Sequence, residues 1–282
     1  MALSVMVAGL LLPYQHEEFL DIVTERSYID LDLLTVGSYW PYLWPATAIV
    51  CVAGVLLSAL AGGGVRAIGA GLVAIIGVLM LAAWLRVAAA VGLLEHGGFG
   101  TGTWLWIGGA VGIAAVGGGV RPRPPPARRT PRRWVWAVTA LGVALIAIGS
   151  VLPSDSFGNR ALWGAEPELA FSLGVRVNAA IVVGTLVIAA IAGLRSGGRS
   201  AGGFSRGVLL GIGLQEALTG AGWLGWLLAG SSASPRAGLF LMLAGGLVLA
   251  GTALVAAQRG PRRAGNLGGA RVVVTPRGGL ID

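Results

Sequence analysis

Seven long apolar runs constrain this chain more than any other feature of its sequence. A hydrocarbon core about 30 Å thick needs about 20 apolar helical residues to cross it, and each run is close to that length. Irregular backbone cannot face lipid, so such spans must be helical. The sequence therefore predicts an all-α integral membrane protein with seven transmembrane helices, at about 41–62, 67–93, 103–119, 134–153, 176–194, 207–230 and 237–257.

The composition agrees with a chain that faces little water. Hydrophobic residues make up 55% of the 282 residues and charged residues only 11%, whereas soluble domains carry about 25% charged residues. All 20 basic residues are arginine, a usage typical of GC-rich bacterial genomes. The single cysteine, Cys51, lies in an apolar run. We expect it to be a small packing residue, because it has no partner for a disulfide or a metal cluster.

An eighth apolar stretch, "ALSVMVAGLLLP" (2–13), is too short to span the membrane. Twelve helical residues reach only about 18 Å. It is also a poor signal peptide, because no basic residue precedes it and no small-residue cleavage site follows. Two interpretations remain open: the stretch is the outer end of a helix whose start is truncated, or it inserts only part way.

Internal similarity points to a duplication. "GLLLP" (9–13) matches "GSVLP" (149–153) at an offset of 140, and Arg66 matches Arg206 at the same offset. The last apolar runs of the two halves are similar in sequence, "LWIGGAVGIAAVG" and "LFLMLAGGLVLAG". These landmarks predict two tandem four-helix units. Because each unit has an even number of spans, the units should be parallel, related by a pseudo-twofold axis along the membrane normal.

This duplication divides the chain into four predicted parts. They are a first four-helix membrane repeat with a short first helix, an Arg/Pro-rich linker, a second four-helix membrane repeat and a basic tail, at 1–120, 121–133, 134–258 and 259–282.

The arginines predict the orientation. Fifteen of the 20 fall on one side of the predicted topology, in the linker, the tail and the short loops at Arg66, Arg195, Arg199 and Arg206, whereas ten of the twelve acids fall on the other. Positive residues near span ends stay in the cytoplasm. We therefore expect a multi-pass protein of the bacterial plasma membrane whose linker and tail are cytoplasmic.

The linker "RPRPPPARRTPRR" also has a predicted partner. Its prolines stop both flanking helices, and its arginines can contact anionic lipid headgroups. A docking peptide for a proline-reading module is the alternative. Nucleic acid is not expected, because the basic segments are short and carry no interleaved aromatics. The predicted lipid contacts are Arg121, Arg123, Arg128, Arg129, Arg132 and Arg133.

Glu216 is the most informative single residue. It follows Arg206 by ten positions, which places it about 15 Å deep, near mid-membrane. A charge there costs about 2.5–3.5 kcal/mol on insertion scales and marks a functional candidate. Gln215 and Thr219 are possible local partners. Two interpretations are open, an interhelical hydrogen bond or a proton or ion relay. We expect Glu216 to face the bundle interior, on the same side as Thr219 and Trp223.

Arg86 is the other intramembrane polar candidate. Residues 67–85 already span the core, so Arg86 should reach the outer interface and snorkel. Its depth differs from that of Glu216 by about ten residues, or about 15 Å, which argues against a direct salt bridge. The sequence shows no nucleophile–base set, phosphate loop or metal motif, so neither a cofactor nor a metal is expected.

The first outer loop, "YQHEEFLDIVTERSYIDLDLL", has an acidic and partly apolar character. In a helix, His16, Glu17 and Asp21 would share a face and could attract a cation, although their spacing matches no metal motif. The apolar residues Phe19, Leu20, Ile22 and Val23 predict a short amphipathic helix on the membrane or against the bundle.

Tryptophans and glycines supply weaker signals. Trp40, Tyr42 and Trp44, then Trp104 and Trp106, then Trp134 and Trp136 stand at span entries, as expected of an interfacial aromatic belt. Gly108–Gly112 and Gly207–Gly211 have the spacing that lets two helices approach closely.

Leu12-Pro13, Leu152-Pro153 and "GTWLW" (102–106) resemble landmarks of four-helix membrane proteins common in actinobacteria. The resemblance covers most of residues 1–257, although the second copy departs with "GLFLM" at 238–242. It implies a four-helix membrane unit, here duplicated, and implies no activity.

Taken together, these features predict a non-catalytic polytopic protein, a structural or accessory subunit that packs against other membrane proteins or against itself. The alternative is a small-solute or proton-coupled transporter that uses Glu216. An integral-membrane enzyme ranks third, because active sites need clusters of polar groups within reach of one another.

Overall fold

The computed structural model contains seven helices and one β-hairpin in the part of the chain that it describes. That part is residues 1–2, 4–5, 8, 13–19, 22–27, 40–90, 99–119, 133–156, 158, 173–197, 202–228 and 233–258, with backbone only over 13–46. The helices are α3 (Trp40–Leu60), α4 (Gly63–Ala90), α6 (Thr101–Gly119), α7 (Arg133–Val151), α8 (Leu173–Gly197), α9 (Gly202–Leu228) and α10 (Ala237–Gln258). A helix covers each of the seven predicted runs, and the ends differ by at most five residues.

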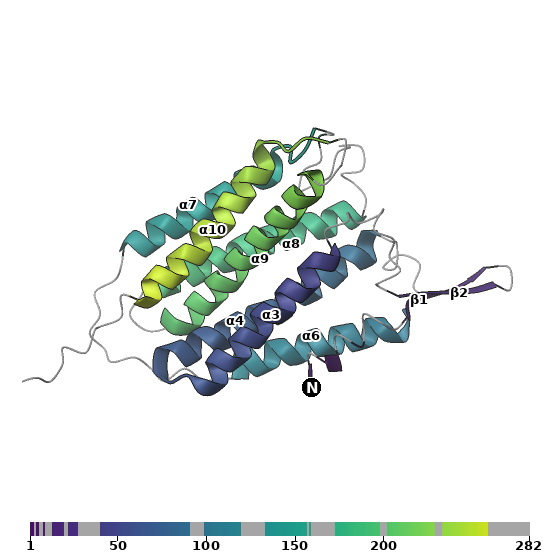
Figure 1. Ribbon diagram of the computed structural model, residues 1–282, viewed down its shortest axis with the longest axis horizontal. Helices are drawn as coiled ribbons and strands as arrows, with labels where there is room; N and C mark the ends of the chain where they lie inside the picture. Colours follow the sequence, from purple (N-terminus) through teal and green to yellow (C-terminus); the bar gives the residue numbers. More distant parts are fainter. Residues whose placement is uncertain are drawn as a thin grey trace, which may run out of the picture.

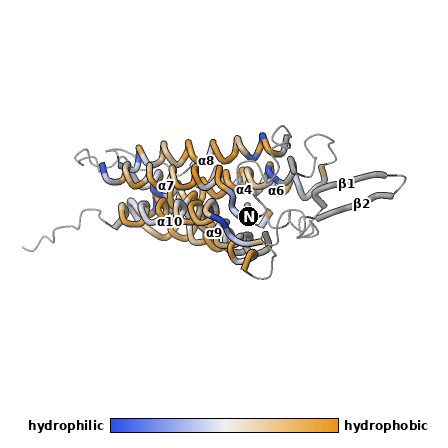
Figure 2. The backbone as a smooth tube through the Cα atoms, turned by 90° about the horizontal axis from the view of Figure 1, so that it is seen from above, coloured by the Kyte–Doolittle hydropathy of each residue, from blue (hydrophilic) through white to orange (hydrophobic). Residues whose placement is uncertain are grey.

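Four helices are long and apolar enough to cross a membrane, namely α4, α7, α8 and α10. A shorter apolar stretch, Thr47–Leu60, lies within α3. Hydrophobic residues run along most of the length of the helices (Figure 2). Many large apolar side chains point outward, such as Ile49, Val183 and Leu247, which are 69%, 54% and 58% exposed. An apolar surface of this kind matches lipid better than water.

The helices lie side by side in one bundle (Figure 1). α4 and α9 pack against each other; α4 also contacts α6 and α3, and α9 also contacts α10 and α8. Two further contacts link the groups, α4 with α8 and α9 with α3. α7 packs against α10 and α8. The described chain thus forms two sets of helices, α3–α4–α6 and α7–α8–α9–α10, that meet at α4 and α9.

Glycines bring the backbones of α4 and α9 into contact. A methyl group at Gly71 would overlap the carbonyl oxygen of Phe204, and one at Gly207 would overlap the carbonyl oxygen of Ile68. Further along the crossing, Gly211 packs against Ile75. Residue numbers increase together along the two helices, so α4 and α9 run parallel. Small residues permit this approach, and the close packing supplies the dispersion energy that holds helices together in lipid.

The same kind of contact, a glycine against a backbone carbonyl oxygen, occurs in two other helix pairs, α4–α6 and α9–α10. A side chain at Gly77 of α4 would lie 2.6 Å from the carbonyl oxygen of Ala110 in α6. A side chain at Gly213 of α9 would lie 2.7 Å from the carbonyl oxygen of Gly246 in α10. Gly77 and Gly213 are 136 positions apart, and so are Ala110 and Gly246. Gly71 and Gly207 have this separation too.

The separation of 136 positions at these contacts differs from the offset of 140 at which the sequence matches Arg66 with Arg206. Counted from the glycine contacts between α4 and α9, Arg66 lies level with Gly202 and not with Arg206. The difference of four residues is close to one helical turn of 3.6 residues. A slip by one turn leaves an apolar pattern almost unchanged, so matching letters could not detect it.

The segment predicted to be the first outer loop contains a β-hairpin where a short amphipathic helix was expected. Strands β1 (Pro13–Phe19) and β2 (Ile22–Ser27) pair antiparallel, with His16 opposite Glu25. The helix prediction was therefore wrong, and with it the shared helix face of His16, Glu17 and Asp21; Asp21 itself lies outside the described residues. Ile22, Val23 and Thr24 are β-branched residues, which favour a strand over a helix. The hairpin projects from one end of the bundle, and β1 contacts α6 (Figure 1).

The N-terminal segment begins as a helix beside α6. Ala2, Ser4, Val5 and Ala8 are helical, and the Val5 amide donates to the Met1 carbonyl oxygen at 2.9 Å. The Ala2 side chain packs against Gly112, where an added Cβ would lie 3.2 Å away. Gly108, its partner in the predicted motif, has nothing within 4 Å. This segment thus occupies the side of α6, as α7 occupies the side of α10.

Trp106 is a core residue and not part of an interfacial belt. It is 1% exposed, and its Nε1 donates to the carbonyl oxygen of Met80 at 3.1 Å. Trp104, two residues earlier, is 62% exposed and contacts Phe99 edge-on, with ring centroids 6.1 Å apart. Consecutive helical residues turn by 100°, so two tryptophans in one helical turn can have opposite environments.

Candidate functional site

Glu216 lies in the middle of α9, where this helix crosses α10. Its side chain is half-buried, and the next residue, Ala217, is buried against Gly246. Leu209 and Ile212 precede Glu216 by seven and four positions, on the same side of the helix, and they are 0% and 1% exposed. The carboxyl group is thus attached to a side of α9 that faces other helices over the two preceding turns.

Arg86 is the cation that acts on the Glu216 carboxyl. The offset of 136 places Arg86 level with position 222 of α9, six residues or about 9 Å from Glu216 along the axis. Helical side chains lean toward the N-terminus, so Arg86 leans toward the depth of Glu216. The vertical separation is therefore smaller than the sequence predicted, because Arg66 lies level with Gly202 and not with Arg206.

Glu216 and Arg86 are not in direct contact. Neither hydrogen bonds nor nitrogen–oxygen distances within 4 Å join them to each other or to other described residues. Arg86 is half-buried, and its Nε is buried without a hydrogen-bond partner. The prediction that Arg86 reaches the outer interface by snorkelling stays a prediction.

Gln215 and Thr219 form a pair of their own. The Gln215 Nε2 donates to the Thr219 Oγ1 at 3.5 Å. Thr219 was expected to be a partner of Glu216, and the structure brings it to the neighbouring residue instead. Positions i and i+4 on a helix lie nearly in line, which explains why Gln215 reaches Thr219.

Four hydroxyl groups inside the helices satisfy the backbone of their own helix. The hydroxyls of Ser150, Thr185, Ser196 and Thr252 each donate to the carbonyl oxygen four residues earlier, at 2.7–2.8 Å. Such bonds remove the cost of a hydroxyl in an apolar interior. Among the described residues, no group of three or more His, Cys, Asp or Glu side chains could hold a metal ion.

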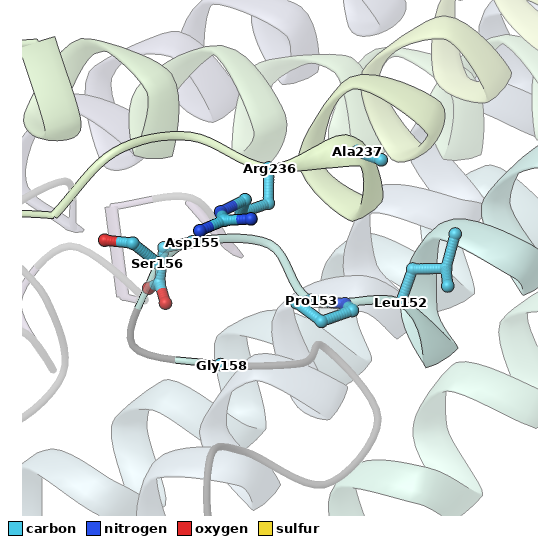
Figure 3. Close-up of a pocket in the computed structure, with 7 residues that line it drawn as sticks. All are labelled: Leu152, Pro153, Asp155, Ser156, Gly158, Arg236 and Ala237. Atoms are coloured by element: carbon cyan, nitrogen blue, oxygen red, sulfur yellow. The ribbon is translucent and has the colours of Figure 1, made fainter.

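A pocket of about 370 Å³ lies at the end of the bundle where α7 ends and α10 begins (Figure 3). Two loops form it and are joined by backbone hydrogen bonds of 2.9 Å, from the Ser156 amide to Ser234 and from the Arg236 amide to Ser154. Asp155 and Pro235 form an isolated β-bridge between the loops. The lining residues are Leu152, Pro153, Asp155, Ser156, Gly158, Arg236 and Ala237. Sequence reasoning missed this pocket, because its two walls come from loops that are far apart in the chain.

The predicted lipid-contacting arginines lie almost entirely outside the described residues. Arg121, Arg123, Arg128, Arg129 and Arg132 are beyond them, and so is the tail after Gln258. Arg133 is exposed and begins α7. The prediction that these arginines meet anionic headgroups therefore stays a prediction.

The chain matches no known protein family, no curated protein and no solved structure.

Proposed function

We propose that the chain is a non-catalytic multi-pass protein of the bacterial plasma membrane, a structural or accessory subunit of a membrane or envelope assembly. The close α4–α9 crossing carries this proposal. Transporters built from repeats bind their substrates near mid-membrane, at the repeat interface. Here the backbones at Gly71 and Gly207 lie against the opposite helix, and Gly211 continues the contact with Ile75. This crossing has no room for a solute between the two helices.

The proposed architecture is two tandem parallel four-helix repeats, with all seven helices as spans and the N-terminal segment as an eighth, short one. The common separation of 136 positions at the glycine contacts supports it. So does the exchange of neighbours, since α4 contacts α8 and α9 contacts α3. Phe99 and Pro235, 136 positions apart, each form a β-bridge two residues before the last helix of their unit.

The proposed orientation places the linker 121–133 and the tail after 258 in the cytoplasm. The excess of arginine at that end supports it, by the rule that positive residues stay inside. The partners are then anionic headgroups on the cytoplasmic leaflet and other membrane proteins or a second copy of this chain. No nucleic acid is among the proposed partners.

A small-solute or proton-coupled transporter is the second candidate. The observation that favours it is the carboxyl group of Glu216 in the middle of α9, with Arg86 acting on it. Ionisable residues inside membranes often mark ion pathways. On the favoured proposal, Glu216 instead stabilises the packing of α9 through its electrostatic interaction with Arg86.

Substitutions of Glu216 test the two functions against each other. Glu216→Gln keeps the size and the hydrogen-bonding capacity of the side chain, so an assembly subunit should keep its membrane level and rescue a deletion strain fully. Glu216→Leu should lower the membrane level, because it leaves no polar side chain at this position to interact with the half-buried Arg86. Both variants are compared with Arg86→Gln in the same strain, by immunoblot, native gel electrophoresis and growth.

The outcomes separate the candidates. If Glu216→Gln reaches the wild-type level yet fails to rescue, a proton relay is supported and the assembly proposal fails. If Glu216→Leu is fully stable and fully active, Glu216 neither stabilises packing nor carries protons, and the transporter candidate loses its only support.

A further inference from the structure

The β-hairpin places three residues of metal-binding type on one of its faces. Successive residues of a strand alternate between the two faces, so His16 and Glu18 of β1 share a face. Glu25 of β2 pairs directly with His16, and directly paired residues lie on the same face. The structure describes the hairpin by its backbone, so the register of the strands, and not a distance between side chains, brings these three residues together.

The same register separates the charges of the hairpin by face. Arg26, the one arginine of the two strands, pairs with Gln15, and Glu17 pairs with Thr24. Both pairs belong to the face opposite to that of His16, because they are one residue removed from it along each strand. The face of His16 therefore combines an imidazole with two carboxylates and holds no arginine.

This arrangement is unfavourable unless a cation is bound. Glu18 pairs with Val23, one step from the pair of His16 with Glu25 along the same face, so the two carboxylates are diagonal neighbours. Like charges this close repel each other. A two-stranded hairpin is also marginally stable in water, and this one projects from the end of the bundle (Figure 1). A cation shared by both strands would offset the repulsion and join the strands.

The spacing and the chemistry suit one zinc ion. Directly paired residues have Cβ atoms about 4.5–5.5 Å apart and diagonal neighbours about 7–8 Å, a range that long side chains bridge. Zinc accepts imidazole nitrogen together with carboxylate oxygen, and three protein ligands with water complete its tetrahedron. Calcium and magnesium prefer oxygen ligands alone, so an imidazole in the set favours a transition metal.

We propose that this face of the hairpin binds one zinc ion through His16, Glu18 and Glu25. The set differs from the one that a helix would have offered, because Glu17 lies on the opposite face of the hairpin. The bound ion would connect β1 to β2 and hold the hairpin in one conformation. The proposal depends neither on the proposed function nor on the proposed orientation.

Zinc binding by the purified full-length chain in detergent tests the site, with an affinity tag that contains no histidine. Isothermal titration calorimetry should show one zinc ion per chain. His16→Ala, Glu18→Gln and Glu25→Gln should each weaken binding by at least about 100-fold, since residues that merely support a metal ligand already contribute about 10–100-fold. Wild-type affinity in His16→Ala would overturn the proposal.

Glu17→Gln is the matched control, because it removes the same charge from the opposite face. It should leave zinc affinity unchanged; a loss equal to that of Glu18→Gln would mean that zinc is attracted by the acidic segment as a whole, and there would be no site. His96→Ala changes the other histidine of the chain and should bind zinc like the wild type. Displacement of zinc by equimolar magnesium would contradict a site that contains an imidazole.

Amide hydrogen exchange separates the loss of a ligand from the loss of the fold. Zinc should slow exchange in β1 and β2 of the wild type and leave it unchanged in His16→Ala. Exchange in α4 and α9 should be the same in both proteins, which shows that the bundle is intact. If zinc leaves exchange in β1 and β2 of the wild type unchanged, the ion binds elsewhere and the proposal fails.

Discussion

Replacing Gly71 or Gly207 with alanine is expected to destabilise the protein more than a methyl group added at any other glycine that the structure describes. Each added Cβ would overlap a backbone carbonyl oxygen of the opposite helix, which cannot move aside as a side chain can. The two helices must separate, and the packing along the whole crossing weakens. Overpacking costs about 1–3 kcal/mol and occasionally more; we expect about 3 kcal/mol for each variant, measured by denaturant titration in detergent micelles.

Gly184→Ala is the matched control. Gly184 lies in the interior of α8, and a Cβ there meets nothing within 4 Å. Alanine is favoured over glycine inside a helix by about 0.5–1 kcal/mol, so this variant should be as stable as the wild type or more stable. Equal effects of Gly71→Ala and Gly184→Ala would show that α4 and α9 do not touch where the structure places them.

Replacing Trp106 with alanine should destabilise the protein at least as much. The side chain is 1% exposed and fills the space between α6 and α4. A buried Trp→Ala change costs about 3–5 kcal/mol, because it leaves a cavity as well as removing contacts. Trp106→Phe keeps most of the volume and loses the 3.1 Å hydrogen bond to Met80, which should cost about 1 kcal/mol. The midpoint of unfolding in detergent gives both values.

Trp104→Phe serves as the control for the tryptophan pair. Trp104 is in the same helical turn and is 62% exposed, so its substitution should change the unfolding midpoint little. A larger loss at Trp104 than at Trp106 would contradict the rotation of α6 in the bundle.

The helices could be predicted from the sequence because the length of a membrane span is set by the bilayer. Their register could not. The match of Arg66 with Arg206 suggested a repeat offset of 140, whereas the contacting glycines Gly71 and Gly207, and likewise Gly77 and Gly213, are 136 positions apart. Apolar sequences repeat every turn, so a slip of about one turn preserves the pattern. Contacts between the backbones fix the register of the helices, and these contacts cannot be recognised by comparing apolar sequences.

The candidate site was predicted only in part. Glu216 and Arg86 stand out in a sequence because charge is expensive in hydrocarbon, but their approach depends on the register between α4 and α9. Thr219 pairs with Gln215 and not with Glu216. The sequence could not predict this, because residue spacing alone does not choose between partners at positions i+3 and i+4. Trp106 was expected in an interfacial belt because it stands at a span entry, but it is 1% exposed, whereas Trp104 is 62% exposed.

The hairpin and the pocket could not be predicted from the sequence, for different reasons. The strands Pro13–Phe19 and Ile22–Ser27 carry apolar residues that also suit an amphipathic helix, and pairing between strands decided the outcome. The pocket depends on Asp155 and Arg236 meeting across the bundle end. Neither residue belongs to a sequence motif, so only the fold brings them together.

Accessibility of four single cysteines tests the parallel repeat and its orientation most directly. Arg66→Cys and Gly202→Cys occupy equivalent positions of the two units, as do Thr101→Cys and Ala237→Cys, each in a Cys51→Ala background. The account predicts that a membrane-impermeant thiol reagent labels positions 101 and 237 in intact cells, and positions 66 and 202 only after lysis. Labelling of one member of a pair without the other would contradict the parallel repeat. Labelling of 66 and 202 alone in intact cells would reverse the orientation.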